Sequence, residues 1–334
     1  MTINMPGKRT TFALLAVVLL PLLAGCTRHS KNERYILVAS NTSIPYWQTV
    51  REGFATAARQ YGVTVDVRGP SNFDPQMEAD DFHSVAASRP AGILVSVADA
   101  TLMTPQIDAA IAAGIPVITV DSDAPSSKRL YFIGTNNLEA GRLGGARVAA
   151  QLNSKGNVVF FTISGQPNLE ERLKGYQDIF ASHPGIKIVD VFDTKGDSGA
   201  AMDKTAEYLA RTGPNKIDAF VSLQSTAAKD VADAFKRANA TGRLIVGMDV
   251  TPATLQLVKD GTIDSTISQK PYTMGLLGLK ALDEIHHYPV QPLGKDYSLD
   301  SYSPFPAFVD TGVALVDQTN VGAVIKGQQG AGSQ

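Results

Sequence analysis

Residues 115–123 read Ile-Pro-Val-Ile-Thr-Val-Asp-Ser-Asp, an apolar and β-branched run that stops at Asp121. A short continuous run of this kind predicts a strand buried on both faces, as in the parallel sheet of an α/β fold. Ligands of such sheets bind just beyond the carboxyl ends of the strands, which makes Asp121 a candidate ligand-binding residue. Taken alone, the same carboxylate could equally cap the following turn.

Other predicted strands also end on polar residues. The polar residues that follow strands near 35–39, 92–95, 218–223, 244–248 and 263–268 are Ser40 and Asn41, Ser96, Gln224 and Ser225, Asp249, and Gln269, respectively. If the strands are parallel, these side chains converge on one edge of the sheet. The pattern predicts a ring of hydrogen-bonding groups around a polar, uncharged ligand.

Strands and helices alternate along the chain. Helices are expected near 46–61, 74–88 and 102–113, and further strands near 63–67 and 130–133. A second round of strands follows near 158–163, 186–191, 217–221, 244–248 and 264–268. Alternation of this kind predicts parallel strands with right-handed crossovers. We therefore expect an α/β protein with two doubly wound parallel-sheet lobes.

The second round opens with a helix start, because Asn136 and Glu139 form a pattern like a capping box. Gly141, Gly144 and Gly145 lie inside this helix and not in the turn after a strand. We interpret them as a close helix contact and not as a nucleotide loop.

The first 26 residues resemble a bacterial lipoprotein signal. Lys8 and Arg9 precede an apolar core at 12–20, and residues 22–26 read Leu-Leu-Ala-Gly-Cys. Cys26 is the only cysteine of the chain, and lipidation would consume its thiol. We expect a signal peptide at 1–25, lipidation of Cys26, a polar tether at 26–34 and a disordered tail at 326–334. The alternative is an ordinary cleaved signal followed by an incidental cysteine.

Length and composition describe a soluble, folded protein. A chain of 334 residues has room for about two domains. Hydrophobic residues make up 44% and charged residues 19%, and the net charge is -2. These totals predict no polybasic face, so we do not expect nucleic acid as a partner.

The chain resembles the type I periplasmic sugar-binding proteins of ABC importers, ribose-binding proteins among them, over roughly residues 35–316. The motifs that carry the resemblance are Ile-Pro-Val-Ile-Thr-Val-Asp at 115–121, Ile-Gly-Thr-Asn-Asn at 133–137 with Gly141, Glu-Arg-Leu-Lys-Gly-Tyr at 171–176, Val-Gly-Met-Asp at 246–249 and Thr-Ile-Ser-Gln at 266–269. The resemblance implies two discontinuous lobes joined by a hinge of three crossings, near 135–138, 269–272 and 303–311. It implies an N-terminal lobe of 33–135 plus 271–303 and a C-terminal lobe of 136–270 plus 304–325.

The resemblance also implies a set of ligand contacts. The positions that match are Ser40, Tyr46, Trp47, Asp121, Asn137, Arg172, Asp249 and Gln269, and the strand ends add Ser96 and Gln224. Carboxylates and a guanidinium can each bind two sugar hydroxyls, and an aromatic pair can cover an apolar face of the ring. For the aromatic pair the alternative is packing at a helix start. For Arg172 it is a surface salt bridge with Glu170 or Glu171.

Partners and location follow from the same resemblance. It implies a small sugar ligand, an ABC permease in the inner membrane, and a monomer in the periplasm or at the cell surface. Departures from the ribose pattern are Ile44, Ser122, Gln224, Met248 and residues 195–197. These departures remove hydrogen bonds and a stacking face, so tight ribose binding is not expected.

Other classes of protein fit less well. Asp121 and Asp123 could serve an enzyme or a metal, but nothing completes a catalytic set, since the five histidines fall in the tether or on predicted helices and their ends. Residues 40–45 lack the glycines of a dinucleotide site. A regulator of the lactose-repressor type would carry a helix-turn-helix head in place of the export signal. We expect no catalytic residue, metal or cofactor. A sensor subunit that presents ligand to a receptor kinase or chemoreceptor remains open beside import.

Overall fold

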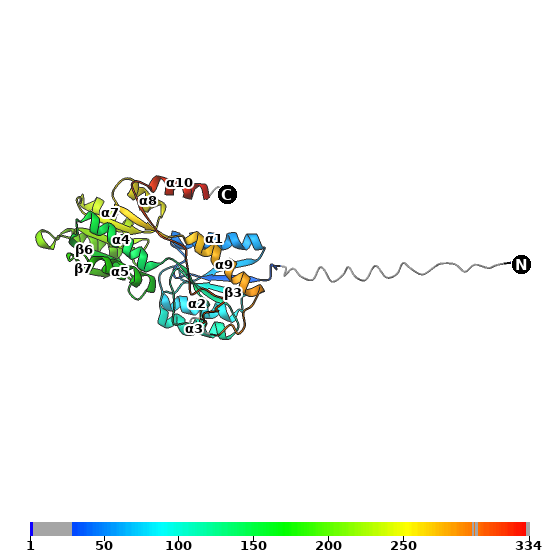
Figure 1. The fold of residues 1–334 in the computed structure, drawn as a ribbon. Helices are drawn as coiled ribbons and strands as arrows, with labels where there is room; N and C mark the ends of the chain where they lie inside the picture. The colour runs from blue at the N-terminus through cyan, green and yellow to red at the C-terminus, as the bar shows by residue number, and fades with distance from the viewer. Residues whose placement is uncertain (3–28, 296, 298–299, 332–334) are drawn as a thin grey trace.

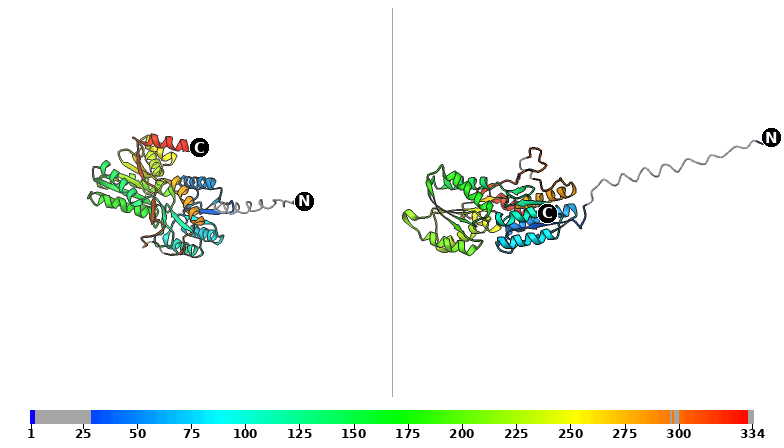
Figure 2. Two further views of the ribbon diagram at one scale, coloured as in Figure 1. Left: turned by 45° about the vertical axis from the view of Figure 1, so that its right-hand side comes forward. Right: turned by 90° about the horizontal axis from the view of Figure 1, so that it is seen from below.

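The computed structural model describes residues 1–2, 29–295, 297 and 300–331. The expected signal peptide and Cys26 lie outside these residues. Within the described part of the chain, no helix has the length and apolar character needed to cross a membrane. Two α/β lobes lie side by side (Figures 1 and 2).

The N-terminal lobe is built on a six-stranded sheet in the order β11-β5-β4-β3-β1-β2. Its strands are β1 (Arg34–Val38), β2 (Thr64–Arg68), β3 (Gly92–Val95), β4 (Val117–Val120), β5 (Phe132–Gly134) and β11 (Phe308–Asp310). Every neighbouring pair is parallel. Helices α1 (Pro45–Tyr61) and α9 (Pro271–His287) cover one face, and α2 (Pro75–Ala87) and α3 (Ala100–Ala112) cover the other (Figure 1).

The C-terminal lobe repeats the arrangement with the order β12-β10-β9-β8-β6-β7. Its strands are β6 (Lys155–Thr162), β7 (Gly185–Asp193), β8 (Ala219–Ser222), β9 (Leu244–Met248), β10 (Ser265–Ser268) and β12 (Ala314–Asp317). Its helices are α4 (Asn137–Gln151), α5 (Pro167–Phe180), α6 (Ser198–Leu209), α7 (Ala227–Ala238), α8 (Pro252–Lys259) and α10 (Val321–Ala331), with the 3₁₀ turn η2 (Gly213–Asn215). Only β12 runs antiparallel to its neighbour among the described pairs. The prediction of an α/β fold with two doubly wound, mainly parallel sheets is confirmed.

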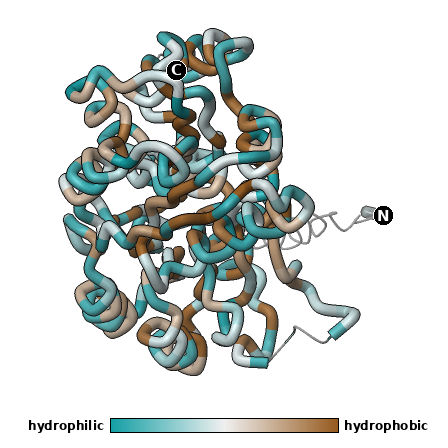
Figure 3. The backbone as a smooth tube through the Cα atoms, turned by 90° about the vertical axis from the view of Figure 1, so that its left-hand side faces the viewer, coloured by the Kyte–Doolittle hydropathy of each residue, from teal (hydrophilic) through white to brown (hydrophobic). Residues whose placement is uncertain are grey.

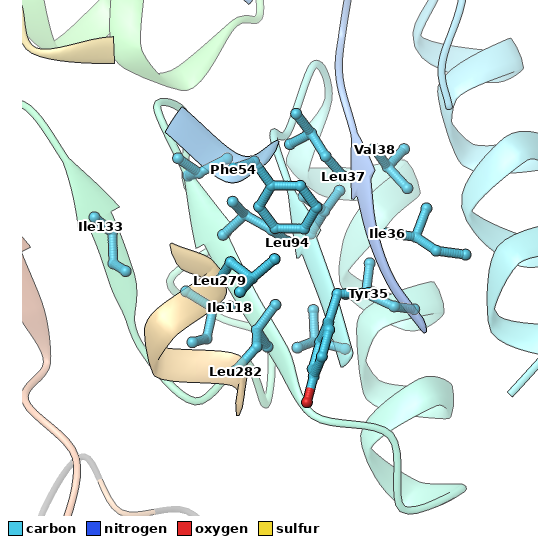
Figure 4. Packing of buried hydrophobic residues seen from close by; sticks show 14 of the residues in the cluster. Tyr35, Ile36, Leu37, Val38, Phe54, Leu94, Ile118, Ile133, Leu279 and Leu282 are labelled. Atoms are coloured by element: carbon cyan, nitrogen blue, oxygen red, sulfur yellow. The ribbon is translucent and has the colours of Figure 1, made fainter. Parts of the chain in front are cut away.

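Buried apolar strands form the centre of each lobe. All residues of β3 and β4 are buried, as the continuous apolar run predicted. Hydrophobic residues accordingly concentrate on segments in the interior, while the outer helices alternate between hydrophobic and polar residues (Figure 3). In the N-terminal lobe, Phe54 of α1 and Leu279 and Leu282 of α9 pack against the strands (Figure 4).

The chain passes between the two sheets three times. The first passage follows β5 at residues 135–136 and the second follows β10 at 269–270, both inside the expected segments. The third lies at 311–313, between β11 and β12. Because β11 pairs with β5, residues 308–310 belong to the sheet of the N-terminal lobe, and their predicted assignment to the C-terminal lobe was wrong. A strand of three residues is too short to be recognised from its pattern of hydrophobic and polar residues.

The C-terminal end also differs from the prediction. Residues 326–331, expected to be disordered, complete helix α10, while 332–334 lie outside the described residues. Val321 is buried in the core of the C-terminal lobe, and Gln328 Nε2 donates to the Val250 carbonyl oxygen at 2.8 Å. A glycine-rich sequence has weak helix propensity, but tertiary contacts can override it.

Helices α4 and α5 meet through glycines. A Cβ atom on Gly141 would lie 2.0 Å from the Arg172 carbonyl oxygen, and one on Gly175 would lie 2.2 Å from the Leu138 carbonyl oxygen. Gly144 faces the Tyr176 ring in the same way. The glycines therefore allow close helix packing, as interpreted from the sequence.

Substitution of Gly141 by alanine should destabilise the protein. The methyl group has to push α5 away, which we expect to cost about 1 to 3 kcal/mol of unfolding free energy. Gly327→Ala is a matched control, because a Cβ there meets nothing and the helix gains propensity. Urea unfolding of the two variants measures the difference. Equal midpoints for both would contradict the packing role of Gly141.

Candidate ligand-binding site

The carboxyl ends of both sheets face a cavity between the lobes. The cavity has a volume of about 230 Å³. Its lining residues come from both lobes: Ser40, Asn41, Ser43, Ile44, Tyr46, Trp47, Ser71, Asn72, Phe73 and Asp121 from the N-terminal lobe, and Ile163, Gln166, Asn168, Leu169, Arg172, Gly196, Gln224, Ser225, Thr226, Asp249 and Gln269 from the C-terminal lobe and its crossing. The cavity therefore lies where the strand-end residues were expected to converge.

Two aspartates occupy equivalent positions in the two lobes. Asp121 directly follows β4 and Asp249 directly follows β9. Both have left-handed backbone conformations, with φ of 64° and 69°. Left-handed conformations are uncommon outside glycine, and strained residues of this kind cluster at ligand sites. The local backbone turns both carboxylates into the cavity between the lobes.

Asp121 joins the lobes by hydrogen bonds. Its Oδ1 accepts a hydrogen bond from the Tyr46 hydroxyl at 2.6 Å, and its Oδ2 accepts one from Asn168 Nδ2 at 3.1 Å. Asn168 belongs to α5 of the opposite lobe. Burial raises the pKa of Asp121, while Arg172 and the Tyr46 hydroxyl oppose the rise. The carboxylate thus bridges the lobes and does not cap a turn.

Arg172 is buried in the C-terminal lobe with only 3% of its surface exposed. Its Nε donates to Asn137 Oδ1 at 2.9 Å, its Nη1 to the Leu223 carbonyl oxygen at 2.8 Å, and its Nη2 to Gln269 Oε1 at 3.2 Å. Three of the five N–H donors of the planar guanidinium are thus paired with these acceptors. The guanidinium is therefore part of the site, and the alternative of a surface salt bridge is wrong.

Asp249 and Gln269 form the third part of the polar network. Gln269 Nε2 donates to Asp249 Oδ1 at 2.8 Å, and Gln269 Oε1 accepts from the Thr135 hydroxyl at 2.8 Å. Thr135 and Gln269 thereby tie two of the crossings together. Burial is the main cause that raises the pKa of Asp249 to about 6, and Arg172 and Gln269 work against it.

Aromatic and aliphatic side chains complete the wall. The rings of Tyr46 and Trp47 meet edge to face with centroids 5.4 Å apart, and both residues line the cavity. Phe73 comes from the loop after β2 and packs against the core of the opposite lobe. A Cβ on Gly196 would lie 2.8 Å from Phe73 Cβ. The ring of Phe73 thus lies next to the segment 195–197, one of the departures from the ribose pattern that were expected to remove a stacking face.

Eight of the ten predicted site residues line the cavity. They are Ser40, Tyr46, Trp47, Asp121, Arg172, Gln224, Asp249 and Gln269. Ser96 and Asn137 are not among the lining residues. Ser96 follows β3 but is fully buried below the rim. Asn137 holds the Arg172 side chain in place.

Several lining residues were missed from the sequence. Gln166 and Asn168 lie in the turn and helix start after β6, and Asn72 and Phe73 lie in the loop after β2. These loops also follow the carboxyl ends of parallel strands, so the rule that found Asp121 and Asp249 could have found them. These residues are harder to recognise in the sequence because several positions lie between the end of each strand and the residue that lines the cavity.

Asp123 has a different role from Asp121. Its carboxylate accepts hydrogen bonds from Arg129 Nε, from Arg129 Nη2 at 2.6 Å and from the Thr119 hydroxyl at 2.6 Å. It is neutralised by an arginine and does not line the cavity. The acidic pair suggested by residues 121–123 is therefore divided between two separate networks.

Comparisons with known proteins agree with this architecture. Residues 35–286 match the family described as periplasmic binding protein domain. The D-allose-binding periplasmic protein of Escherichia coli (strain K12) is 27% identical over 259 residues, which cover 74% of this chain and 83% of that protein.

Solved structures give the same result. The arabinose-binding protein AraP of Geobacillus stearothermophilus superposes with a TM-score of 0.71 at 31% identity, covering 87% of this chain and 98% of that one. A solute-binding protein of an ABC transporter from Burkholderia graminis, solved with D-arabinose, has a TM-score of 0.78 at 26% identity, covering 87% and 96%.

These relatives are named as binding proteins, which confirms the prediction that the chain is not an enzyme. The match to the family covers most of the chain, and the solved relatives share both lobes. The chain therefore belongs to the periplasmic binding protein family and has the two-lobed type I fold.

Proposed function

We propose that the protein captures a neutral monosaccharide or sugar-like polyol between its lobes and delivers it to an ABC import permease. The observation that carries the proposal is the Asp121 carboxylate, bridged by Tyr46 of its own lobe and Asn168 of the other at the wall of the cavity. A ligand between the lobes can contact both of them at once and so favour the closed arrangement, as in the hinge closure of periplasmic binding proteins.

The chemistry of the cavity supports a polyhydroxyl ligand. Asp121 and Asp249 offer carboxylate oxygens and Arg172 offers donors, which suits hydroxyl groups that both donate and accept. Tyr46, Trp47 and Phe73 offer apolar faces for the C–H surface of a ring. The volume of about 230 Å³ lies below the roughly 300–1,000 Å³ of pockets for drug-sized ligands, which favours a single sugar ring over a disaccharide.

A thermal-shift screen tests the ligand class. The panel contains pentoses, including D-arabinose, hexoses such as D-allose, polyols and disaccharides. A ligand that binds only the folded state raises its stability, so a monosaccharide or polyol should raise the melting temperature and disaccharides should not. Calorimetric titration then gives the affinity of each hit. A panel without any hit, or with hits among the disaccharides alone, would contradict the proposal.

We also propose that the protein is anchored to the membrane by lipid on Cys26. This is supported by the Leu-Leu-Ala-Gly-Cys run and by the absence of any other cysteine from the sequence. Cys26→Ser should move the protein from the membrane fraction into the soluble extracytoplasmic fraction, because the thiol that takes the lipid is gone. Cell fractionation with immunoblotting measures this. A variant that stays with the membrane would contradict lipidation at Cys26.

A further inference from the structure

A group of histidines and carboxylates lies at the edge of the N-terminal lobe that faces away from the cavity. Its members are His29, Glu33, Asp283 and His287, which we call the histidine–carboxylate cluster. Glu33 precedes β1, whereas Ser40 follows the same strand and lines the cavity. The cluster is therefore separated from the ligand site by the full length of β1.

His29 falls in the segment 26–34 that was expected to be a polar tether, but in the structure it packs on the N-terminal lobe. Residues 29–33 contact the lobe, since His29 stacks on the Tyr61 ring with centroids 4.8 Å apart. His29 Nε2 lies 2.8 Å from Asp283 Oδ2, and His287 Nε2 lies 3.5 Å from Glu33 Oε2. One ligand atom from each of His29, Asp283 and His287 lies within 4.8 Å of the others.

Hydrogen bonds to the outer atoms orient three of the four side chains. The Tyr35 hydroxyl donates to Asp283 Oδ1 at 3.1 Å, and the Ser30 amide donates to Glu33 Oε1 at 3.0 Å. His287 Nδ1 lies 3.0 Å from the Asp283 carbonyl oxygen, which can only accept. Nδ1 therefore carries the hydrogen, and Nε2 of the neutral ring presents its lone pair to the cluster. Residues that bind metals are oriented by such outer hydrogen bonds.

Tyr35 links the cluster to the hydrophobic core. Its ring is packed among buried side chains of the lobe, and its hydroxyl lies at the edge of this group (Figure 4). The Asp283 carboxylate oxygen can only accept a hydrogen bond, so the Tyr35 hydroxyl is the donor. The position of the Asp283 carboxylate is thus set by the core and not by flexible surface groups.

Burial and charge also suit a cation. The side chains of Asp283, His287 and Glu33 are 7%, 9% and 14% exposed, and Oε2 of Glu33 has no hydrogen-bond partner among the described residues. Two carboxylates beside two histidines leave a negative charge that a divalent cation would balance. His29 is 34% exposed, which leaves a path for an ion from solvent.

We propose that the histidine–carboxylate cluster binds a divalent transition metal of the zinc class through His29 Nε2, His287 Nε2, Asp283 Oδ2 and Glu33 Oε2. Zinc accepts imidazole nitrogen at about 2.0–2.1 Å and carboxylate oxygen at about 2.0–2.2 Å, so its tetrahedral ligands lie roughly 3.3 Å apart. The separations of 2.8 Å between His29 Nε2 and Asp283 Oδ2 and of 3.5 Å between His287 Nε2 and Glu33 Oε2 lie near that value. The ligand atoms of His29, Asp283 and His287 lie within 4.8 Å of one another, so a bound ion would draw them closer together. Bound metal would fasten the segment at His29 to the end of α9.

Zinc titration of the metal-free protein tests the proposal. The protein carries Cys26→Ser to remove its only thiol, has no polyhistidine tag, and is stripped with EDTA. Calorimetry should find one equivalent of Zn²⁺, and Co²⁺ should give the visible absorption of tetrahedral coordination. His29→Ala and His287→Gln should each weaken Zn²⁺ binding by more than the roughly 10- to 100-fold that a change in an outer hydrogen bond costs. Tyr35→Phe should weaken it by about tenfold, because Asp283 loses its orienting donor.

Matched controls separate metal binding from folding. His83→Ala removes an exposed histidine of α2 and should leave the Zn²⁺ affinity unchanged. Melting curves in EDTA should show that His29→Ala is folded. The sugar affinity measured in EDTA should equal the affinity measured with Zn²⁺, since the cavity lies at the other edge of the sheet. Wild-type protein that binds no Zn²⁺, or His29→Ala protein with wild-type Zn²⁺ affinity, would overturn the proposal and leave the proposed sugar binding untouched.

Discussion

Arg172→Ala should weaken binding of the preferred sugar by about 2 to 4 kcal/mol, a factor of roughly 30 to 1,000 in Kd. The guanidinium is held by Asn137, the Leu223 carbonyl and Gln269, so it is already oriented before a ligand enters. Its loss leaves these acceptors and the ligand hydroxyls without a donor in a closed, buried space. An unpaired buried polar group costs its full desolvation energy.

Electrostatics adds to this loss. Arg172 opposes the rise in pKa of both Asp121 and Asp249. Without it, the pKa of each carboxyl moves further upward, and the two acids lose part of their acceptor strength near neutral pH. One substitution therefore weakens three of the polar groups that line the cavity.

Calorimetric titration with the best sugar of the screen measures the effect. Arg142→Ala is the matched control, because Arg142 is a partly exposed arginine of α4 that pairs with Asp178 outside the cavity. Its Kd should stay within about twofold of wild type, as expected for an exposed ion pair. Arg172→Lys keeps the charge but loses the planar fork, and should fall between the two. If Arg172→Ala binds within about threefold of wild type, the ligand does not depend on this network.

Single residues show how far sequence alone could go. Asp121 and Asp249 were predicted because each directly ends a continuous apolar strand, and both line the cavity. Ser96 satisfied the same rule but is buried below the rim, because the rule gives the end of the strand and not the direction of the side chain. Phe73 and Asn168 escaped because they lie several residues beyond their strands.

Long-range pairings were the hardest to predict. Strand β11 is three residues long, and only its pairing with β5 shows which lobe it joins. The helical end of the chain depends on contacts of α10 with the C-terminal lobe, including Gln328 to Val250. The histidine–carboxylate cluster joins positions more than 250 residues apart, as the 254-residue separation of His29 and Asp283 shows. Local patterns carry no information about such contacts.

Asp249→Asn should produce opposite changes in stability and in affinity. The carboxyl of Asp249 has a pKa of about 6 in the folded protein against its ordinary value of 3.8 in the unfolded chain, mainly because it is buried. Between these pH values the folded state binds more protons than the unfolded state, so the contribution of Asp249 to stability falls as pH rises from about 4 to about 6. The loss is on the order of 3 kcal/mol and persists at neutral pH.

Asparagine cannot ionise, and it tolerates the left-handed conformation at φ of 69°. Its side-chain oxygen can still accept the hydrogen bond from Gln269 Nε2. We therefore expect the ligand-free variant to melt a few degrees above wild type at pH 7, with the difference shrinking toward pH 4. Melting curves at several pH values measure this, and Asp260→Asn serves as the control, because the pKa of Asp260 is lowered by its hydrogen bonds to Thr262. Because the pKa of Asp260 is lowered and not raised, its carboxylate stabilises the folded protein at neutral pH. Asp260→Asn should therefore not raise the melting temperature at pH 7.

Sugar binding should change the other way. A hydroxyl donates a stronger hydrogen bond to a carboxylate than to an amide oxygen, so Asp249→Asn should weaken binding by about 1.5 to 3 kcal/mol at pH 7. Wild-type affinity should rise as pH increases through about 6, where Asp249 ionises, and the variant should lose that part of the rise. On this account, the Asp249 carboxylate lowers the stability of the ligand-free protein but strengthens ligand binding, because the ligand hydroxyls donate hydrogen bonds to it. A variant that melts below wild type at pH 7 while binding sugar equally well would contradict both halves of this account.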